Sequence, residues 1–333
     1  MKAIVDRNYG SPDVLKCEEV EKPTPGDNEV LIEVRAAAVN PLDWHLMKGK
    51  PFLGRLLFGL RKPKTTRPGV DVAGRVEAVG RSVTQFKPGD EVFGSCRGAF
   101  ADYVCTPESA LVMKPDNMTF EQAASAPTAV LTALQGLRDK GQIQPGQKVL
   151  INGAAGGVGT FAVQIAKWFG AEVTGVCSTR NLDMVRSLSA DHVIDYTQED
   201  FTKSGQRYDL IFDLVANHSL LACRRVLNPK GIYIGAGVLG VSMIGLLARL
   251  IKAPVLSLFV SQKFVTFMAR RNKEDLTFMR ELMTAGKVTP VIDRRYTLSE
   301  VPQAIRYLAE GHARGKVVIT LESSNCGPGD DIY

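Results

Sequence analysis

The first third of the chain alternates apolar and polar positions in the way that is typical of short β-strands. Residues 29–34 alternate, residues 76–80 repeat the pattern, and turns such as the one at 87–90 separate these segments. This spacing predicts a compact β domain of the barrel type. The pattern changes at Thr119, where we expect a helix over 120–124, because threonine is a good N-cap residue.

Continuous apolar runs alternate with segments of helical period from residue 149 onward. Uninterrupted apolar strands connected by helices indicate a parallel sheet covered by helices on both faces. The fold class is therefore predicted to be α/β, and a helix over 273–285 and a strand over 316–321 complete the pattern. The expected strands are 149–152, 173–177, 193–195, 210–214 and 232–235, and the expected helices between them are 158–169, 182–188 and 219–227.

A length of 333 residues corresponds to about two domains of ordinary size. A composition of 45% hydrophobic and 23% charged residues excludes global disorder, collagen and coiled coil. Asp6 interrupts any apolar core of a secretion signal, and the longest apolar run, residues 232–248, is short for a membrane span and contains several glycines. We therefore expect a soluble, cytoplasmic protein.

The net charge of +6 is concentrated in two stretches without acids, residues 44–70 and 214–273. Such stretches could flank an anionic ligand, face an anionic membrane, or be solvated loops. For the apolar part of the second stretch, residues 238–260, a pocket lid, a dimer interface and a membrane contact all stay open. No nucleic-acid-binding module appears, so nucleic acid is not an expected partner. Six cysteines without a CxxC pair predict neither a disulfide framework nor a zinc ribbon.

A glycine-rich turn joins the first strand of the second half to its first helix. Glycines permit a tight turn and a close approach of backbone amides to a pyrophosphate, which the N-terminus of the following helix also favours. Because a strand precedes the turn and an amphipathic helix follows it, the motif predicts a dinucleotide site. The residues expected to contact the cofactor are Gly153, Ala155, Gly156, Gly157 and Val158.

The residues after the second strand of this half indicate which dinucleotide binds. NAD sites usually place Asp or Glu there to bind the ribose 2′-hydroxyl. Here the strand is followed by Ser178 and Arg180, and no acid comes before Asp183. A hydroxyl and a guanidinium at these positions could hold a 2′-phosphate, so the expected cofactor is NADPH.

Six segments together resemble the zinc-independent medium-chain dehydrogenases/reductases of the quinone oxidoreductase (zeta-crystallin-like) family, over nearly the whole chain. The resemblance implies a GroES-like β domain made of residues 1–126 and 270–333, with a Rossmann domain, a doubly wound parallel sheet, at 127–269. It also implies a homodimer, because relatives commonly pair through the Rossmann domain. The segments are 9–15, 38–43, 68–74, 98–104, the glycine turn and 312–318.

Zinc-dependent relatives have a cysteine where this chain has Asn40, and Gly-His-Glu where it has Gly69, Val70 and Asp71. Catalytic zinc needs about three protein ligands, so no metal is expected. Without a Lewis acid, hydride transfer is easier to a quinone or to the β-carbon of an enone, where charge delocalises, and the resemblance implies the same substrates. We therefore predict an NADPH-dependent reductase of quinones or activated enones. The alternatives are a non-catalytic NADPH-binding module, redox-sensing or structural, and a zinc-free alcohol dehydrogenase.

The resemblance also implies where the site residues lie. Asn40 would form hydrogen bonds near the nicotinamide or the substrate oxygen, or be a structural amide of its loop. Asp43 would act in catalysis, orient its loop or support a partner residue, and His45 would be an acid near neutral pH or a solvated loop side chain. Several relatives have a tyrosine in place of His45. Further expected cofactor contacts are Thr132 near the nicotinamide, Tyr196 beside the adenosine phosphate, Val215, Gly235, Ala236 and Gly237 at strand ends, and Lys316 at a C-terminal basic position.

Overall fold

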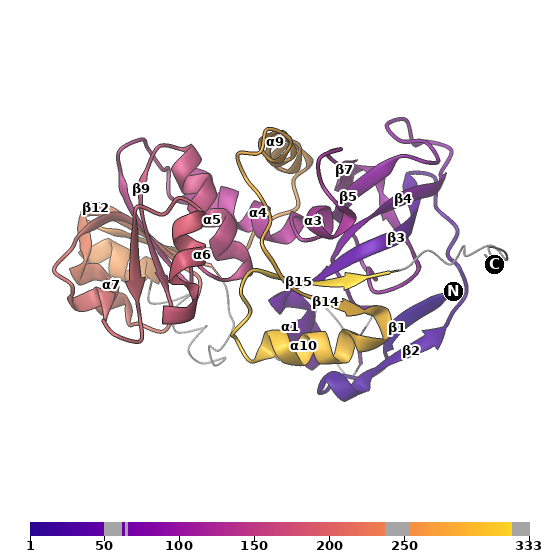
Figure 1. The fold of residues 1–333 in the computed structure, drawn as a ribbon, viewed down its shortest axis with the longest axis horizontal. Helices are drawn as coiled ribbons and strands as arrows, with labels where there is room; N and C mark the ends of the chain where they lie inside the picture. Colours follow the sequence, from indigo (N-terminus) through magenta and orange to yellow (C-terminus); the bar gives the residue numbers. More distant parts are fainter. Residues whose placement is uncertain (50–61, 64–65, 237–252, 322–333) are drawn as a thin grey trace, which may run out of the picture.

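Two sheets and the helices around them form two halves that lie side by side (Figure 1). The computed structural model describes residues 1–49, 62–63, 66–236 and 253–321. One half contains a six-stranded sheet in the order β10-β9-β8-β11-β12-β13, in which every neighbouring pair is parallel. Its strands are β8 (Lys148–Asn152), β9 (Glu172–Cys177), β10 (His192–Asp195), β11 (Tyr208–Asp213), β12 (Leu227–Gly235) and β13 (Lys263–Thr266).

Both faces of the parallel sheet are buried, as its uninterrupted apolar strands predict. Val149 and Ile151 of β8 belong to one hydrophobic core, whereas Leu150 between them belongs to the core on the opposite face. The helices of this half are α5 (Gly157–Trp168), α6 (Leu182–Ser187) and α7 (Leu220–Arg225). The predicted α/β class with a doubly wound parallel sheet is confirmed.

The predicted boundaries are wrong around residue 227. The structure ends α7 at Arg225 and begins β12 at Leu227, so the expected helix over 219–227 is too long and the expected strand too short. Pairing explains the difference, because Leu227 lies opposite Tyr208 of β11 and a register shift separates this pair from the regular pairing at Ile232. A local hydrophobic pattern does not encode such a long-range partner.

The other half is a β structure made from both ends of the described chain. Its seven strands run in the order β14-β15-β3-β4-β5-β7, with β6 also paired to β3, and β1 and β2 form a separate pair. This arrangement confirms the predicted GroES-like β fold, while the domain boundaries given above stay a prediction. The strands are β1 (Lys2–Asp6), β2 (Leu15–Glu19), β3 (Glu29–Val39), β4 (Asp71–Val79), β5 (Glu91–Ser95), β6 (Tyr103–Pro107), β7 (Leu111–Met113), β14 (Ile292–Thr297) and β15 (Lys316–Thr320).

The register of β3 gathers three polar residues at one end of this sheet. Ala38 lies opposite Asp71, the first residue of β4. Val39 lies opposite Val317, so Lys316, the first residue of β15, comes beside Asn40, which directly follows β3. Residues that are far apart in the sequence therefore meet at the end of β3.

Helices α3 and α4 connect the two halves, and α9 lies beside them (Figure 1). Thr119 caps α3 as predicted, because its hydroxyl accepts a hydrogen bond of 3.3 Å from the Gln122 amide. Gln135, which directly follows α4, donates to the Asp275 carboxylate of α9 over 2.9 Å. The bounds are α1 (Pro41–Lys48), α3 (Phe120–Ala124), α4 (Pro127–Leu134), α9 (Lys273–Thr284) and α10 (Val301–Ala309).

The apolar stretch 238–260 falls largely outside the described residues, since the structure does not describe 237–252. The described remainder begins with a helical segment over 253–259 that ends in Leu258 and Phe259, each 81% exposed. In the described ranges, no helix combines the length and the apolar character needed to cross a membrane.

Candidate active site

The glycine turn after β8 has the backbone geometry that its sequence predicts. Gly153 has φ of +89°, a conformation that residues with a side chain rarely adopt. A Cβ at Gly159 would lie 2.1 Å from the carbonyl oxygen of Gly153, so only glycine lets α5 approach β8 this closely. At Gly156, by contrast, the nearest atom to an added Cβ is the carbonyl oxygen of Gly153 at 3.5 Å, which is an ordinary van der Waals distance.

The N-terminus of α5 carries uncompensated positive partial charge. The first backbone N–H groups of a helix have no acceptor within the helix, and the helix dipole adds to their charge. The first turn of α5 contains no acidic residue. Helix α5 therefore presents amide donors and favours an anion, which is what a dinucleotide pyrophosphate requires.

The segment before β15 contacts this glycine turn from the β half. The Gly315 amide donates to the Ala155 carbonyl over 2.8 Å. A Cβ at Gly157 would lie 2.8 Å from Cδ of Lys316, so the lysine side chain passes directly over the start of α5. The predicted cofactor residues Gly157 and Lys316 are thus brought together across the two halves.

Asn40 and Lys316 are joined by a short hydrogen bond. Lys316 Nζ donates to Asn40 Oδ1 over 2.6 Å, and both side chains are nearly inaccessible to solvent. The Asn40 amide group donates to the Ala38 carbonyl at 3.2 Å and to Asp71 Oδ2 at 3.0 Å. Since both amide hydrogens have protein acceptors, the structure assigns Asn40 the task of orienting Lys316. The expected contact of Asn40 with nicotinamide or substrate stays a prediction.

Asp43 lies on the first turn of α1 and closes its capping box. Its Oδ2 accepts a hydrogen bond of 2.8 Å from the Asn40 amide, and the residue is 1% exposed. Burial raises the pKa of Asp43 to about 7, the neighbouring Asp71 adds to the increase, and Lys316 opposes it. Asp43 therefore fixes the end of β3 against the start of α1, which is the orienting role that the sequence suggests.

Asp71 is the central site residue that sequence reasoning missed. It is fully buried, and its Oδ1 accepts a hydrogen bond of 2.6 Å from the Thr128 hydroxyl, while Oδ2 lies 3.7 Å from Lys316 Nζ. A signal was available, because Asp71 stands where zinc-dependent relatives have the glutamate of Gly-His-Glu. Thr132 lies one turn beyond Thr128 and donates its hydroxyl hydrogen to the Thr128 carbonyl over 2.7 Å. The contact of Thr132 with the nicotinamide stays a prediction.

His45 is half-buried on α1, two residues after Asp43. Its ring meets that of Trp44 edge to face, with a centroid separation of 4.8 Å. The structure therefore places a titratable side chain on the same helix as Asp43, and its catalytic role stays a prediction.

The ends of β9 and β10 carry the residues expected at the adenosine end of the cofactor. The Ser178 hydroxyl accepts from the Asn181 amide at 3.1 Å, and Tyr196, 53% exposed, directly follows β10. Arg180 donates to the His312 carbonyl over 2.8 Å, and Arg314 donates back to the Arg180 carbonyl over 3.0 Å. The segments of Arg180 and Arg314, one from each half, are thus joined by two side-chain-to-backbone hydrogen bonds beside the end of β9.

A buried carboxylate, Asp213, organises the C-terminal ends of β8, β11 and β12. It accepts 2.8 Å and 2.7 Å hydrogen bonds from Asn152 and Tyr233. It also accepts 3.1 Å and 2.8 Å bonds from the amides of Val215 and Ala216, the latter with φ of +62°. Asp213 thereby fixes the loop that carries Val215, a residue predicted to contact the cofactor. Gly235 ends β12, the Ala236 amide bonds the Asp213 carbonyl over 3.0 Å, and Gly237 lies outside the described residues.

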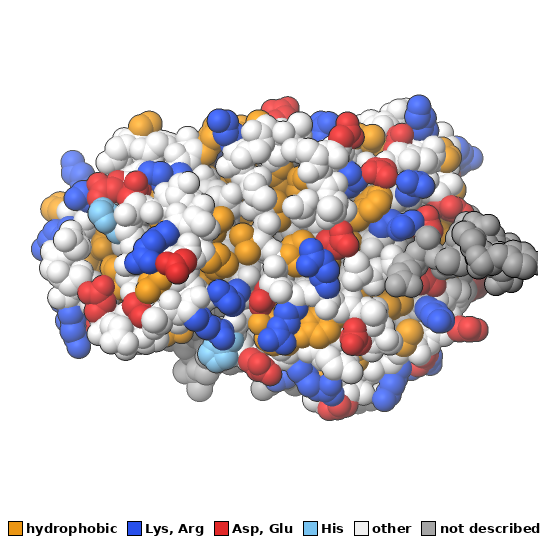
Figure 2. Space-filling view, in the orientation of Figure 1, with side chains coloured by type: hydrophobic (Ala, Val, Ile, Leu, Met, Phe, Trp, Pro, Cys, Tyr) orange, Lys and Arg blue, Asp and Glu red, His pale blue; other side chains and the backbone are white. Residues whose placement is uncertain are grey.

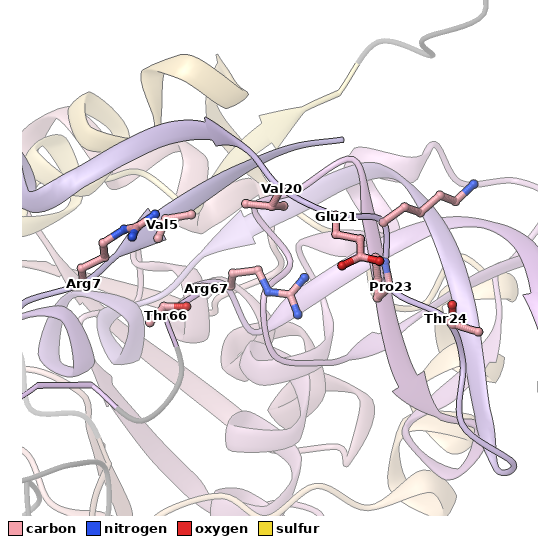
Figure 3. Close-up of a pocket in the computed structure, with 9 residues that line it drawn as sticks. Val5, Arg7, Val20, Glu21, Pro23, Thr24, Thr66 and Arg67 are labelled. Carbon is pink, nitrogen blue, oxygen red and sulfur yellow. The ribbon is translucent and has the colours of Figure 1, made fainter.

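A cavity of about 540 Å³ lies elsewhere, beside β1 (Figure 3). Two of its cations have partners, since Arg7 lies 2.5 Å from Glu18 and Lys22 lies 2.8 Å from Glu77. None of the predicted site residues lines this cavity. The face in Figure 2 instead shows apolar side chains gathered between the two halves, with Lys and Arg side chains below them.

Comparisons with known proteins agree with this geometry. Residues 26–116 match the alcohol dehydrogenase GroES-like domain, and residues 188–319 match the model described as zinc-binding dehydrogenase. A quinone-oxidoreductase, QR1, of Triphysaria versicolor is 34% identical, over 96% of this chain and 98% of its own. An NADPH-dependent alkenal/one oxidoreductase of Arabidopsis thaliana is 35% identical, over 96% and 79%.

This chain belongs to the quinone oxidoreductase family of medium-chain dehydrogenases/reductases. The structure of the quinone oxidoreductase from Coxiella burnetii superposes with a TM-score of 0.86 and 32% identity, covering 97% of this chain and 99% of that one. The family resemblance inferred from the sequence is therefore confirmed. Within the described residues, no three His, Cys, Asp or Glu side chains are grouped closely enough to hold a metal ion.

The residues of this family member fit a nicotinamide dinucleotide. The first turn of α5 offers amide donors without an acidic residue, the Lys316 side chain passes over Gly157, and Arg180 and Arg314 supply two guanidinium groups. The α5 N-terminus and Arg180 follow the C-terminal ends of β8 and β9, the edge at which such sheets bind dinucleotides. The segment of Arg314 and Lys316, at the start of β15, contacts this edge from the β half.

The glycine turn gives a matched pair of substitutions. Gly159→Ala should lower the free energy of unfolding by more than about 2 kcal/mol, because its methyl group meets backbone that cannot move aside. Gly156→Ala should leave unfolding nearly unchanged, because its methyl group meets no atom closer than an ordinary contact distance. It should weaken the binding of a nicotinamide dinucleotide, because the methyl group stands at the N-cap of α5, beside the first amides of the helix. Urea denaturation and calorimetry measure both effects. Equal stability of the two variants would contradict the assignment.

The raised pKa of Asp43 predicts a pH-dependent stability. Between pH 4 and 7 the unfolded chain loses the Asp43 proton while the folded chain keeps it, so this group lowers stability as pH rises. Asp43→Asn removes that loss and can still accept the Asn40 hydrogen bond. Its unfolding free energy relative to wild type should rise by more than about 1 kcal/mol from pH 4 to 7.

Burial also raises the pKa of Asp6 to about 7, so Asp6 contributes to the pH dependence of stability in both proteins. The difference in unfolding free energy between Asp43→Asn and wild type removes this shared contribution and is therefore the quantity to measure. Urea unfolding at several pH values gives this difference. A difference that stays constant between pH 4 and 7 would show that Asp43 has an ordinary pKa.

Proposed function

We propose that this protein is an NADPH-dependent reductase that transfers hydride to quinones or to activated α,β-unsaturated carbonyl compounds. The observation that carries the proposal is the meeting of Lys316 from the β half with the start of α5 from the parallel-sheet half. A relative of about the same length is named for quinones, and a longer relative, of which the match covers 79%, is named for alkenal/one substrates. The same proposal includes the domain division 1–126 plus 270–333 and 127–269.

The protein residues would act by binding and positioning. Bound NADPH supplies the hydride. The α5 amides and the Lys316 ammonium bind the anionic part of the cofactor, and Asn40 holds the Lys316 side chain in place. Helix α4, which carries Thr132, borders the space where the nicotinamide is expected. The proton that completes the reduction comes from water or from a side chain of α1 such as His45.

NADPH is preferred over NADH because of the charges beside β9. The 2′-phosphate would meet the guanidinium groups of Arg180 and Arg314, with the Ser178 hydroxyl beside them. Arg180 must then exchange its His312 carbonyl partner for the phosphate, a stronger charge-assisted bond. Arg314 was not among the residues predicted from the sequence, because its contact with Arg180 spans 134 residues.

Steady-state oxidation of NADPH against a panel of quinones and enones tests the function. We expect turnover with at least one class and none in the absence of an acceptor. Tight NADPH binding without turnover on any acceptor would favour the non-catalytic module. Alcohol-dependent reduction of NADP⁺ would favour the zinc-free alcohol dehydrogenase.

Arg180→Ala tests the cofactor preference. Loss of one charge-assisted bond to phosphate should raise the Michaelis constant for NADPH by roughly tenfold and leave that for NADH nearly unchanged. Arg186→Ala is the matched control, because Arg186 pairs with Asp183 on the exposed side of α6. An equal change for both cofactors would refute the phosphate contact.

A homodimer is part of the same proposal. The exposed Leu258 and Phe259 side chains support a contact surface in the segment before β13. Analytical ultracentrifugation should find a dimer that Leu258→Ser with Phe259→Ser dissociates. Binding of these side chains to anionic vesicles, with the protein monomeric in solution, would instead favour the membrane contact.

The cytoplasmic location is also part of the proposal and rests on the sequence alone.

A further inference from the structure

Asp71 is a buried anion shared by both halves of the molecule. Its side chain is inaccessible to solvent at the first position of β4. A carboxylate in such a place is stable only where donors or cations surround it. It has both, because Thr128, Asn40 and Lys316 all approach it.

The contact with Thr128 gives α4 the cap that its own sequence lacks. The residue at the N-cap position is Ala126, whose methyl group accepts no hydrogen bond. The Thr128 backbone amide lies 3.2 Å and 3.3 Å from the two Asp71 oxygens, and the Thr128 hydroxyl lies 2.6 Å from Oδ1. Asp71 therefore caps α4 from a strand of the β half, and an anion there also complements the helix dipole.

Lys316 approaches the second oxygen of the Asp71 carboxylate, Oδ2, whereas the Thr128 hydroxyl is bound to Oδ1. Oδ2 lies 3.7 Å from Lys316 Nζ and also accepts from Asn40, whose oxygen holds the same ammonium group at 2.6 Å. The Lys316 side chain is only 4% exposed and runs over Gly157 at the start of α5. Asp71 is thus the counter-ion of the ammonium group whose side chain passes over the glycine turn.

We propose that Asp71 is a positioning residue for the cofactor. Its carboxylate keeps Lys316 charged and in place over the start of α5, and it fixes the start of α4. This inference rests on the proposed function only in that the ligand is NADPH. Asp71 acts through protein groups, because Thr128, Asn40 and Lys316 surround its carboxylate.

The protonation of Lys316 distinguishes this role from simple packing. Burial lowers the pKa of Lys316, whereas Asp71 first and Asp43 second raise it. When Asp71 loses its charge, the pKa of Lys316 falls further, and the ammonium is lost at a lower pH. NADPH binding should then weaken more steeply as the pH rises.

The experiment measures the dissociation constant of NADPH by calorimetry at pH 7 and pH 9.5, for the full-length chain. Asp71→Asn should weaken binding by at least roughly tenfold at pH 9.5. At pH 7 the same substitution should cause a loss of affinity that is at least roughly threefold smaller than the loss at pH 9.5. Asp71→Asn combined with Lys316→Arg should lose this pH dependence, because a guanidinium stays protonated throughout.

Thr128→Val is the matched control. It removes the hydroxyl bond to Asp71 but keeps the carboxylate charge, so any change in affinity should be the same at both pH values. Wild-type affinity of Asp71→Asn at pH 9.5, or a loss that is equal at both pH values with Lys316 present, would overturn the proposal.

A variant Asp71→Asn that fails to fold leaves a second comparison. Wild-type binding measured up to pH 10 should then weaken as Lys316 loses its proton, and the binding of Lys316→Arg should not; identical curves would overturn the proposal. The binding measurement does not depend on turnover. If the protein bound NADPH but reduced no acceptor, the proposed reductase would be refuted and this test would remain valid. Absence of NADPH binding in the wild type would overturn both.

Discussion

A carboxylate without access to water must have its charge balanced by the groups around it, and in this fold that requirement links both halves. Asp71 can exist as a buried anion only while β3, β15 and α4 bring Asn40, Lys316 and Thr128 to it. Each of these three groups in turn has an unfavourable environment without Asp71: a buried ammonium, a buried amide and an uncapped helix. The mutual dependence explains how one polar cluster can set the relative position of a sheet end, a helix start and the glycine turn.

The same logic operates at a second buried acid. Asp213 holds the ends of β8, β11 and β12 in register through Asn152 and Tyr233, and its remaining capacity fixes the loop that begins at Val215. The cofactor edge of the parallel sheet is therefore stiffened by hydrogen bonds to one carboxylate. Local order at this edge favours a preformed site, because less conformational entropy is lost when a ligand binds.

The sequence predicted the parts of the site that depend on neighbouring residues. The strand before the glycine turn, the turn itself and the helix after it are encoded within residues 148–168, and Thr119 signals its own helix. Asp71 was missed because its role depends on Thr128 and Lys316, which are 57 and 245 residues away in the sequence. Arg314 was missed because its contact with Arg180 spans 134 residues. Asn40 was recognised as a site residue, but its orientation toward Lys316 follows from the pairing of β15 with β3, which no local pattern contains.

That pairing has a consequence for the order in which the chain acquires its structure. The strands of the parallel sheet lie within 148–266, so this half has all its strands once that stretch has left the ribosome. The β half does not, because β15 stands inside its sheet, between β14 and β3. Until residues 316–320 emerge, residues 36–39 of β3 keep an unpaired edge of the kind that attracts other strands. Strand β15, the last of the described strands, thus completes the pairing of β3 and brings Lys316 to Asn40 in the same event, so that this part of the site forms only after residues 316–320 have been synthesised.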